Sequence, residues 1–280
     1  MISYRLSVAV LAAFVGLSCT VQAATLHLPG TPSTMEVRSV FNQKTLFLNL
    51  SEVAGRLGVT VKRDTSAGVI VLCSPQACVP VFEQDEAEVQ KKDSVLFVRT
   101  DEVAAALGCS FNVKKKTDVT LTCNGGLPQG PVGAQVGDMA PGFRLPVDTV
   151  STMSLAERLQ QRPLLVVFFR NGDWDPFSKL LLNLLQTHLD SVRALGYDLV
   201  AIHGYEAKTA MKWTKDLGLS YPLLSDQYSA VFRAYDVFDR GHFPLPSVFA
   251  IDRSGHIRMR YMFDLSAAPD MSAILQTLKR

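Results

Sequence analysis

The sequence has little histidine and little excess of basic charge. It has five histidines in 280 residues, and the first 130 residues hold only His27, with no paired histidines or methionines at metal-ligand spacing. Its net charge is only +2, far from the strongly basic balance of a nucleic-acid binder. We therefore expect no metal, no cofactor and no nucleic-acid partner.

Long apolar runs are missing too, except at the start of the chain. Arg5 precedes the run Leu6–Leu17, and the small residues Ala23 and Ala24 follow. This order is typical of an export signal, predicted at residues 1–24. It is too short and wrongly flanked for a membrane anchor, so the mature protein is expected to be periplasmic and not membrane-spanning.

Cysteine is scarce and unevenly distributed. None of the five follows Cys123. One, Cys19, lies in the export segment and offers an alternative, a lipoprotein lipidated there, although Gly16 stands where a large apolar residue is expected. Removal of Cys19 leaves four, and an even number in an exported chain favours disulfides, with three possible connectivities.

Hairpin geometry indicates how these four cysteines pair. If a hairpin turns about Lys116, Cys109 and Cys123 lie opposite each other on adjacent strands. Cys73 and Cys78 then close a short loop. The rival pairing joins Cys73 to Cys123, and the functional alternative is a redox-active pair that passes electrons.

The first half of the chain contains an internal repeat. Residues 45–73 align with residues 95–123 without a gap, and 9 of the 29 positions are identical. Each copy predicts a strand, a helix that ends at Gly58 or Gly108, and a hairpin. The pattern resembles the copper amine oxidase N-terminal-like domain over residues 25–123. Despite that name the resemblance implies no copper, and we interpret the module as an α+β interaction or stalk domain.

A glycine- and proline-rich stretch, residues 124–137, predicts a linker between two domains. The second domain is expected at residues 138–280.

The second domain is organised around one strand, turn and helix. Leu164–Phe169 is an apolar run typical of a buried strand, and Pro176 is suitably placed in the first turn of the helix that follows. The turn reads GDWDPFS. It resembles the redoxin group that includes the alkyl hydroperoxide reductase and thiol-specific antioxidant (AhpC/TSA) proteins, in particular the members that read GDWCPFC at this turn. Asp175 and Ser178 stand at the two cysteine positions.

Three further motifs match that family in its order. They are Tyr221–Asp226, Tyr235–Val237 and Pro246–Arg258. The resemblance covers residues 135–263 and implies an α/β thioredoxin-like fold, an antioxidant oxidoreductase, and a cis peptide bond at Pro246, facing the turn.

Neither replacement supports the family's chemistry, which forms a bond to a cysteine sulfur. A carboxylate at Asp175 is instead expected to cap the helix, typically worth ~0.5–2 kcal/mol. We therefore expect a redoxin-like fold without its usual redox activity.

A groove beside the turn is the candidate binding site. An extended peptide or a cell-envelope protein is its expected partner. A sharper alternative makes Asp175 and His242 a general-base pair or part of a metal site. The predicted groove residues are Arg170, Trp174, Phe177, His242 and Pro246.

Two functions follow as hypotheses. The first is a non-catalytic binding or scaffold protein of the cell envelope, in which a duplicated stalk presents a thioredoxin-like domain. The second is a peroxiredoxin-like antioxidant enzyme that uses the cysteines of the first domain or a non-thiol site.

Overall fold

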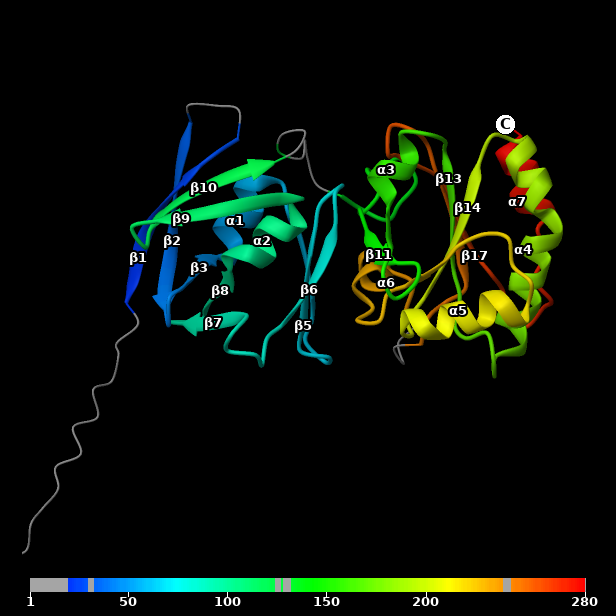
Figure 1. Ribbon diagram of the computed structural model, residues 1–280, viewed down its shortest axis with the longest axis horizontal. Helices are drawn as coiled ribbons and strands as arrows, with labels where there is room; N and C mark the ends of the chain where they lie inside the picture. Colours follow the sequence, from blue (N-terminus) through cyan, green and yellow to red (C-terminus); the bar gives the residue numbers. More distant parts are fainter. Residues whose placement is uncertain (1–19, 30–32, 124–126, 128–131, 239–242, 280) are drawn as a thin grey trace, which may run out of the picture.

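The computed structural model describes residues 20–29, 33–123, 127, 132–238 and 243–279. They form an N-terminal and a C-terminal region that lie side by side (Figure 1). No helix in these residues is long and apolar enough to cross a membrane. Most of the predicted export signal, Cys19 included, lies outside the described residues. Its last residues, from Val21, belong to the first strand, in which Ala24 is fully buried.

The N-terminal region is built on a seven-stranded sheet in the order β7-β8-β3-β2-β1-β10-β9. Its neighbours are antiparallel except for the parallel pair β1 and β10. Two helices, α1 (Leu50–Leu57) and α2 (Thr100–Ala106), contribute to its core. The strands are β1 (Val21–His27), β2 (Thr34–Asn42), β3 (Thr45–Asn49), β7 (Val89–Lys92), β8 (Val95–Arg99), β9 (Cys109–Lys114) and β10 (Asp118–Cys123).

A separate three-stranded sheet lies between this sheet and the C-terminal region (Figure 1). Its antiparallel strands are β4 (Thr60–Asp64), β5 (Val69–Cys73) and β6 (Cys78–Phe82). Disulfides join Cys73 to Cys78 and Cys109 to Cys123, each across a pair of strands with Cα atoms 4.2 Å apart. The pairing of Cys73 with Cys123 therefore does not occur.

The C-terminal region has a five-stranded sheet in the order β15-β14-β13-β16-β17. The first two pairs of neighbours are parallel and the last two antiparallel. The strands are β13 (Leu164–Phe168), β14 (Asp198–His203), β15 (Leu223–Ser225), β16 (Ser247–Ile251) and β17 (Ile257–Met262).

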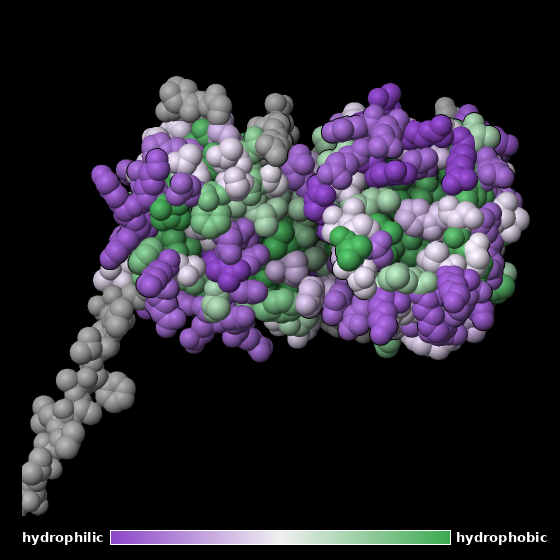
Figure 2. All heavy atoms as spheres, in the orientation of Figure 1, coloured by the Kyte–Doolittle hydropathy of each residue, from purple (hydrophilic) through white to green (hydrophobic). Residues whose placement is uncertain are grey.

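The central strand β13 is fully buried because both of its faces are covered. Leu165 and Val167 face a core shared with α4 (Pro176–Ala194), α5 (Ala207–Asp216) and α7 (Ser272–Leu278). The alternate residues face the N-terminal side, where the covering elements are α3 (Leu155–Leu159), α6 (Ala230–Ala234), β11 (Arg144–Pro146) and β12 (Thr152–Ser154). On the face drawn in Figure 2, both regions show hydrophilic residues interspersed with hydrophobic patches.

The core on the N-terminal side of β13 crosses the predicted domain boundary. Val69, Val71 and Cys73 of β5 belong to the same apolar cluster as the residues of α6. Of the predicted linker, Val132 and Ala134 are buried, and Val132 exchanges hydrogen bonds with the hydroxyl of Thr60. The described end of the linker is thus packed into the junction, because its apolar side chains have a surface to bury against.

Candidate functional site

The turn between β13 and α4 brings Asp175 and Ser178 together. Pro176 occupies the first turn of α4, and Asp175 is the N-cap, whose side chain accepts a hydrogen bond from Ser178 N at 3.3 Å. The hydroxyl of Ser178 donates to Asp175 Oδ2 at 2.5 Å. The expected helix cap is therefore formed.

Ser178 also holds the preceding backbone. Its Oγ accepts hydrogen bonds from Arg170 N at 3.0 Å and from Asn171 N at 3.4 Å. Ser178 is fully buried and Asp175 is 7% exposed. Both polar groups are thus hydrogen-bonded within the turn.

Two residues that sequence reasoning missed shape the rest of the turn. Asn171 Oδ1 accepts hydrogen bonds from Asp173 N at 2.7 Å and Trp174 N at 3.0 Å, the local pattern for which asparagine is favoured in turns. Gly172 lies against Trp213, and a Cβ there would come within 2.7 Å of the indole ring. The sequence signal that could have identified these two residues is an asparagine followed by a glycine, shortly after a buried strand.

Pro246 corrects one expectation. The backbone of the described residues has no cis peptide bond, so Leu245–Pro246 is trans. On either side of this bond the chain is already hydrogen-bonded as an extended segment, since Leu245 N donates to Val237 O and Pro246 O accepts from Phe263 N. The trans form, favoured for most X–Pro bonds, satisfies both contacts. Pro246 is buried.

An aromatic pocket of about 290 Å³ lies beside the turn. Two predicted residues line it, Arg170 and Trp174, and Trp174 is 60% exposed. Phe177 instead contacts Phe263 edge-on, with ring centroids 5.7 Å apart, and His242 lies outside the described residues. The remaining lining residues are Gly204, Tyr205, Ser229, Phe238, Phe243 and Pro244.

The sequence did not reveal this pocket because, besides the turn, its walls come from segments that are far apart in the chain. Tyr205 follows β14, Ser229 precedes α6, and Phe243 and Pro244 precede β16. Arg170 connects the turn to the wall at Pro244, since its Nε donates to Pro244 O at 2.7 Å. Aromatic side chains at unrelated sequence positions carry no spacing signal.

A buried histidine supports the wall at Tyr205. His203 has no exposed surface, and its Nδ1 accepts a hydrogen bond from Tyr205 N at 3.1 Å. Its ring lies 5.1 Å from Trp213 and 5.7 Å from Phe169, centroid to centroid. Burial lowers the pKa of His203 to about 4. The imidazole is therefore neutral near pH 7 and serves as part of an aromatic cluster.

A buried carboxyl supports the wall at Ser229. Asp226 is 3% exposed and accepts hydrogen bonds from Ala230 N and Phe232 N, each at 2.9 Å, at the start of α6. Burial raises its pKa to about 6, although these N–H groups favour the charged form. Ser229, which lies between Asp226 and Ala230, adopts a left-handed conformation with φ of 55°.

The described residues contain no group of three or more side chains suited to hold a metal ion. Nor do they place a base beside Ser178 other than its own cap, Asp175. The general-base or metal hypothesis for Asp175 and His242 therefore gains no support from the part of the chain that is described.

Comparison with known proteins gives a match for the C-terminal region. The AhpC/TSA family matches residues 136–260, whereas no curated protein matches the chain. Similar solved structures include a Plasmodium vivax 2-Cys peroxiredoxin, at 20% identity and a TM-score of 0.47, covering 51% of this chain and 79% of that one. The peroxidoxin BcpB of Mycobacterium tuberculosis has 21% identity and a TM-score of 0.46, covering 52% and 96%. The family match alone identifies residues 136–260 as an AhpC/TSA redoxin domain.

Proposed function

We propose that this protein is an exported, non-catalytic binding protein whose redoxin domain has lost its thiols and holds an extended segment of a partner protein. The single observation that carries the proposal is the buried pair Asp175–Ser178. Two side chains stand where the family resemblance implies reactive cysteines, and they hydrogen-bond each other instead.

Chemistry supports the loss of activity. Attack on a peroxide or a disulfide needs a thiolate, and residues 124–280 contain no cysteine. An aspartate and a buried serine cannot form the sulfur bond. The turn keeps its shape because Ser178 supplies the hydrogen bonds that order it.

The aromatic pocket supports a binding role. Trp174, Tyr205 and Phe243 are 60%, 38% and 57% exposed, so a large apolar area remains available beside the turn. Rigid aromatic rings around a concave surface are suited to bind apolar or aromatic side chains. Its volume of about 290 Å³ fits one or two such side chains.

The N-terminal half supports placement in the cell envelope. Its apolar start matches an export signal, and its two disulfides suit an oxidising compartment. Residues 45–73 and 95–123 each form a strand, a helix and two antiparallel strands. We interpret them as two copies of one module, similar to the copper amine oxidase N-terminal-like domain, that presents the redoxin domain.

One observation favours a second candidate, a peroxiredoxin-like antioxidant that uses Cys73 and Cys78. Cys78 lines a cleft of about 520 Å³ between the two regions, beside Arg144 and Glu157. Attack on Cys78, however, must expel Cys73 as a thiolate from an apolar core in which it is 1% exposed. An apolar environment raises the pKa of a thiol, and a thiol with a raised pKa is a poor leaving group. We therefore rank this candidate second.

Two assays on the full chain separate the candidates. Hydroperoxide turnover with a dithiol reductant is measured for the wild type and for the double variant Cys73→Ser/Cys78→Ser, and the first proposal expects none. Selection from a random peptide library is expected to yield apolar or aromatic sequences. Their affinity should be lost in Trp174→Ala and kept in Leu180→Ala, which removes an exposed apolar side chain from α4 instead. Turnover that requires Cys73 and Cys78 would establish the enzyme instead.

A further inference from the structure

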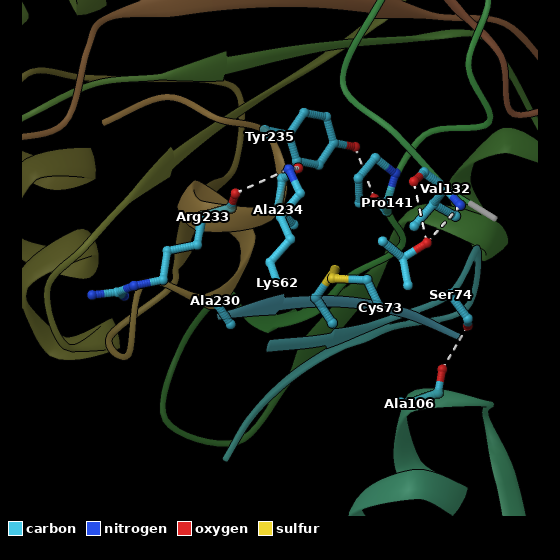
Figure 3. The surroundings of a disulfide bond; sticks show 12 residues. Lys62, Cys73, Ser74, Ala106, Val132, Pro141, Ala230, Arg233, Ala234 and Tyr235 are labelled. Atoms are coloured by element: carbon cyan, nitrogen blue, oxygen red, sulfur yellow. Dashed lines mark hydrogen bonds between the residues drawn. A yellow bond between two sulfur atoms is a disulfide. The ribbon is translucent and has the colours of Figure 1, made fainter. Parts of the chain in front are cut away.

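The short helix α6, which follows one wall of the aromatic pocket, is clamped by the N-terminal region. Lys62 of β4 donates from Nζ to Ala234 O at 2.7 Å, at the end of the helix, and to Asp236 Oδ1 at 2.7 Å. Figure 3 shows Lys62 pointing at the last residues of this helix, with Cys73 beside Ala230. A cation at the carboxyl end of a helix binds otherwise unpaired carbonyls.

A second contact extends this clamp towards the pocket. Asp64 of the same strand pairs with Arg233 Nε at 3.1 Å, and the two side chains are 18% and 16% exposed. The Ser66 hydroxyl, together with Ala67 N and Arg233, lowers the pKa of Asp64 to about 2 despite its partial burial. The carboxylate is therefore ionised at any pH near neutrality, and the ion pair persists.

Arg233 reaches the pocket wall itself. Its guanidinium lies 5.3 Å from the centre of the Phe238 ring, and its Nη1 donates to Ser229 O at 3.2 Å. Ser229 and Phe238 both line the pocket. One side chain thus contacts the N-terminal region through Asp64 and the pocket through two of its lining residues.

We propose that the β4–β6 sheet regulates the aromatic pocket, with Lys62 and Asp64 acting as positioning residues that hold Ser229 and Phe238 through α6 and Arg233. The proposal rests on the binding function assigned to that pocket. It means that the N-terminal region controls the affinity of the redoxin domain for its partner, in addition to presenting it.

The chain supplies a matched control for this idea. Arg63 lies next to Lys62 on β4, and side chains alternate between the two faces of a strand. Arg63 pairs with Glu83 of the N-terminal region. Lys62→Met and Arg63→Met therefore remove neighbouring cations of similar length, one with and one without contact to α6.

The test is amide hydrogen exchange in the full chain, because it needs no ligand. Lys62→Met is expected to speed exchange in residues 229–238 by about tenfold and Arg63→Met to leave it unchanged, with Lys62→Arg restoring protection. Asp64→Asn keeps the side-chain acceptor for Ser66 and Ala67 and, like Lys62→Met, is expected to speed exchange in residues 229–238. Unchanged exchange at 229–238 in both Lys62→Met and Asp64→Asn would overturn the proposal.

Binding of the fluorescent apolar anion anilinonaphthalene sulfonate is measured on the same proteins. We expect about fivefold weaker binding in Lys62→Met than in Arg63→Met, because a loosened wall lowers the population of the formed pocket. Equal affinity in these two variants would contradict the proposed regulation. If neither the wild type nor Trp174→Ala binds the probe, the proposed pocket function fails. Amide hydrogen exchange alone then decides whether Lys62 and Asp64 hold residues 229–238.

Discussion

The two hairpins of the N-terminal half have related sequences and different surroundings. The hairpin of β4 and β5 packs against the redoxin domain, and every residue of β5 is buried. The hairpin of β9 and β10 extends the seven-stranded sheet, where β9 is an edge strand with several exposed residues. A shared pattern of residues thus specifies the same local structure, but the neighbours of each hairpin decide what it buries.

Residues at equivalent positions of the two hairpins provide the strongest test of this difference. Leu72 of β5 is fully buried in the core of the N-terminal region, on the face of β5 that points away from the redoxin domain. Thr122, at the equivalent position of β10, is exposed. Leu72→Ala is expected to lower the free energy of unfolding by about 2–5 kcal/mol because it leaves a cavity. Thr122→Ala is expected to change it by less than about 0.5 kcal/mol. Urea denaturation measures both, and similar losses would contradict the contrast.

The acid stability of the protein is expected to depend on two buried groups of the C-terminal region. Between pH 6.5 and about 4 the unfolded state protonates His203 while the folded state does not, so this group lowers stability as pH falls, by about 3 kcal/mol in total. Asp226 acts in the opposite sense. In the folded state the pKa of Asp226 is about 6, compared with 3.8 when unfolded. The stability that its protonation contributes is therefore lost as pH rises between those values.

The two effects are expected to offset each other between about pH 4 and 6. Asp226→Asn removes one of them and should steepen the loss of stability on acidification, whereas His203→Gln should reverse the slope. Chemical denaturation at a series of pH values measures these slopes. A pH dependence that neither substitution alters would rule out this account.

The two disulfides differ in the length of chain that they close. Cys109 and Cys123 are separated by 14 positions and Cys73 and Cys78 by 5. From chain entropy alone, removal of the longer crosslink should cost about 3 kcal/mol and removal of the shorter one about 2 kcal/mol. Double Cys→Ala variants test the order by thermal unfolding. A larger loss for Cys73 and Cys78 would mean that packing at the junction outweighs loop closure.

The smallest expected effect on stability belongs to the pocket. Trp174 is 60% exposed, so Trp174→Ala should change the free energy of unfolding by about 0.5 kcal/mol or less, although it removes a main binding surface. Its thermal midpoint should match that of Leu180→Ala. A large drop in the midpoint would show that Trp174 stabilises the turn, and a loss of binding could then not be assigned to the pocket.

Much of the redoxin domain could be predicted from the sequence. The apolar run of β13, the proline at the start of α4 and the cap at Asp175 are local features, and the structure contains all three. Of the predicted groove, Arg170 and Trp174 line the pocket, Phe177 turns to Phe263, and Pro246 is trans and buried. Tyr205, Phe238 and Phe243 were missed because only the folded chain brings them together.

What the sequence by itself determined is local: the strands and helices, and the absence of cysteine after Cys123. Periodicity, capping residues and turns act over a few residues, so a single sequence is enough to predict them. The tertiary structure alone decided that β5 completes the core of the redoxin domain and that Lys62 contacts α6. Burial of apolar surface is non-directional, so a pattern of residues shows that a face must be covered and not which distant segment covers it.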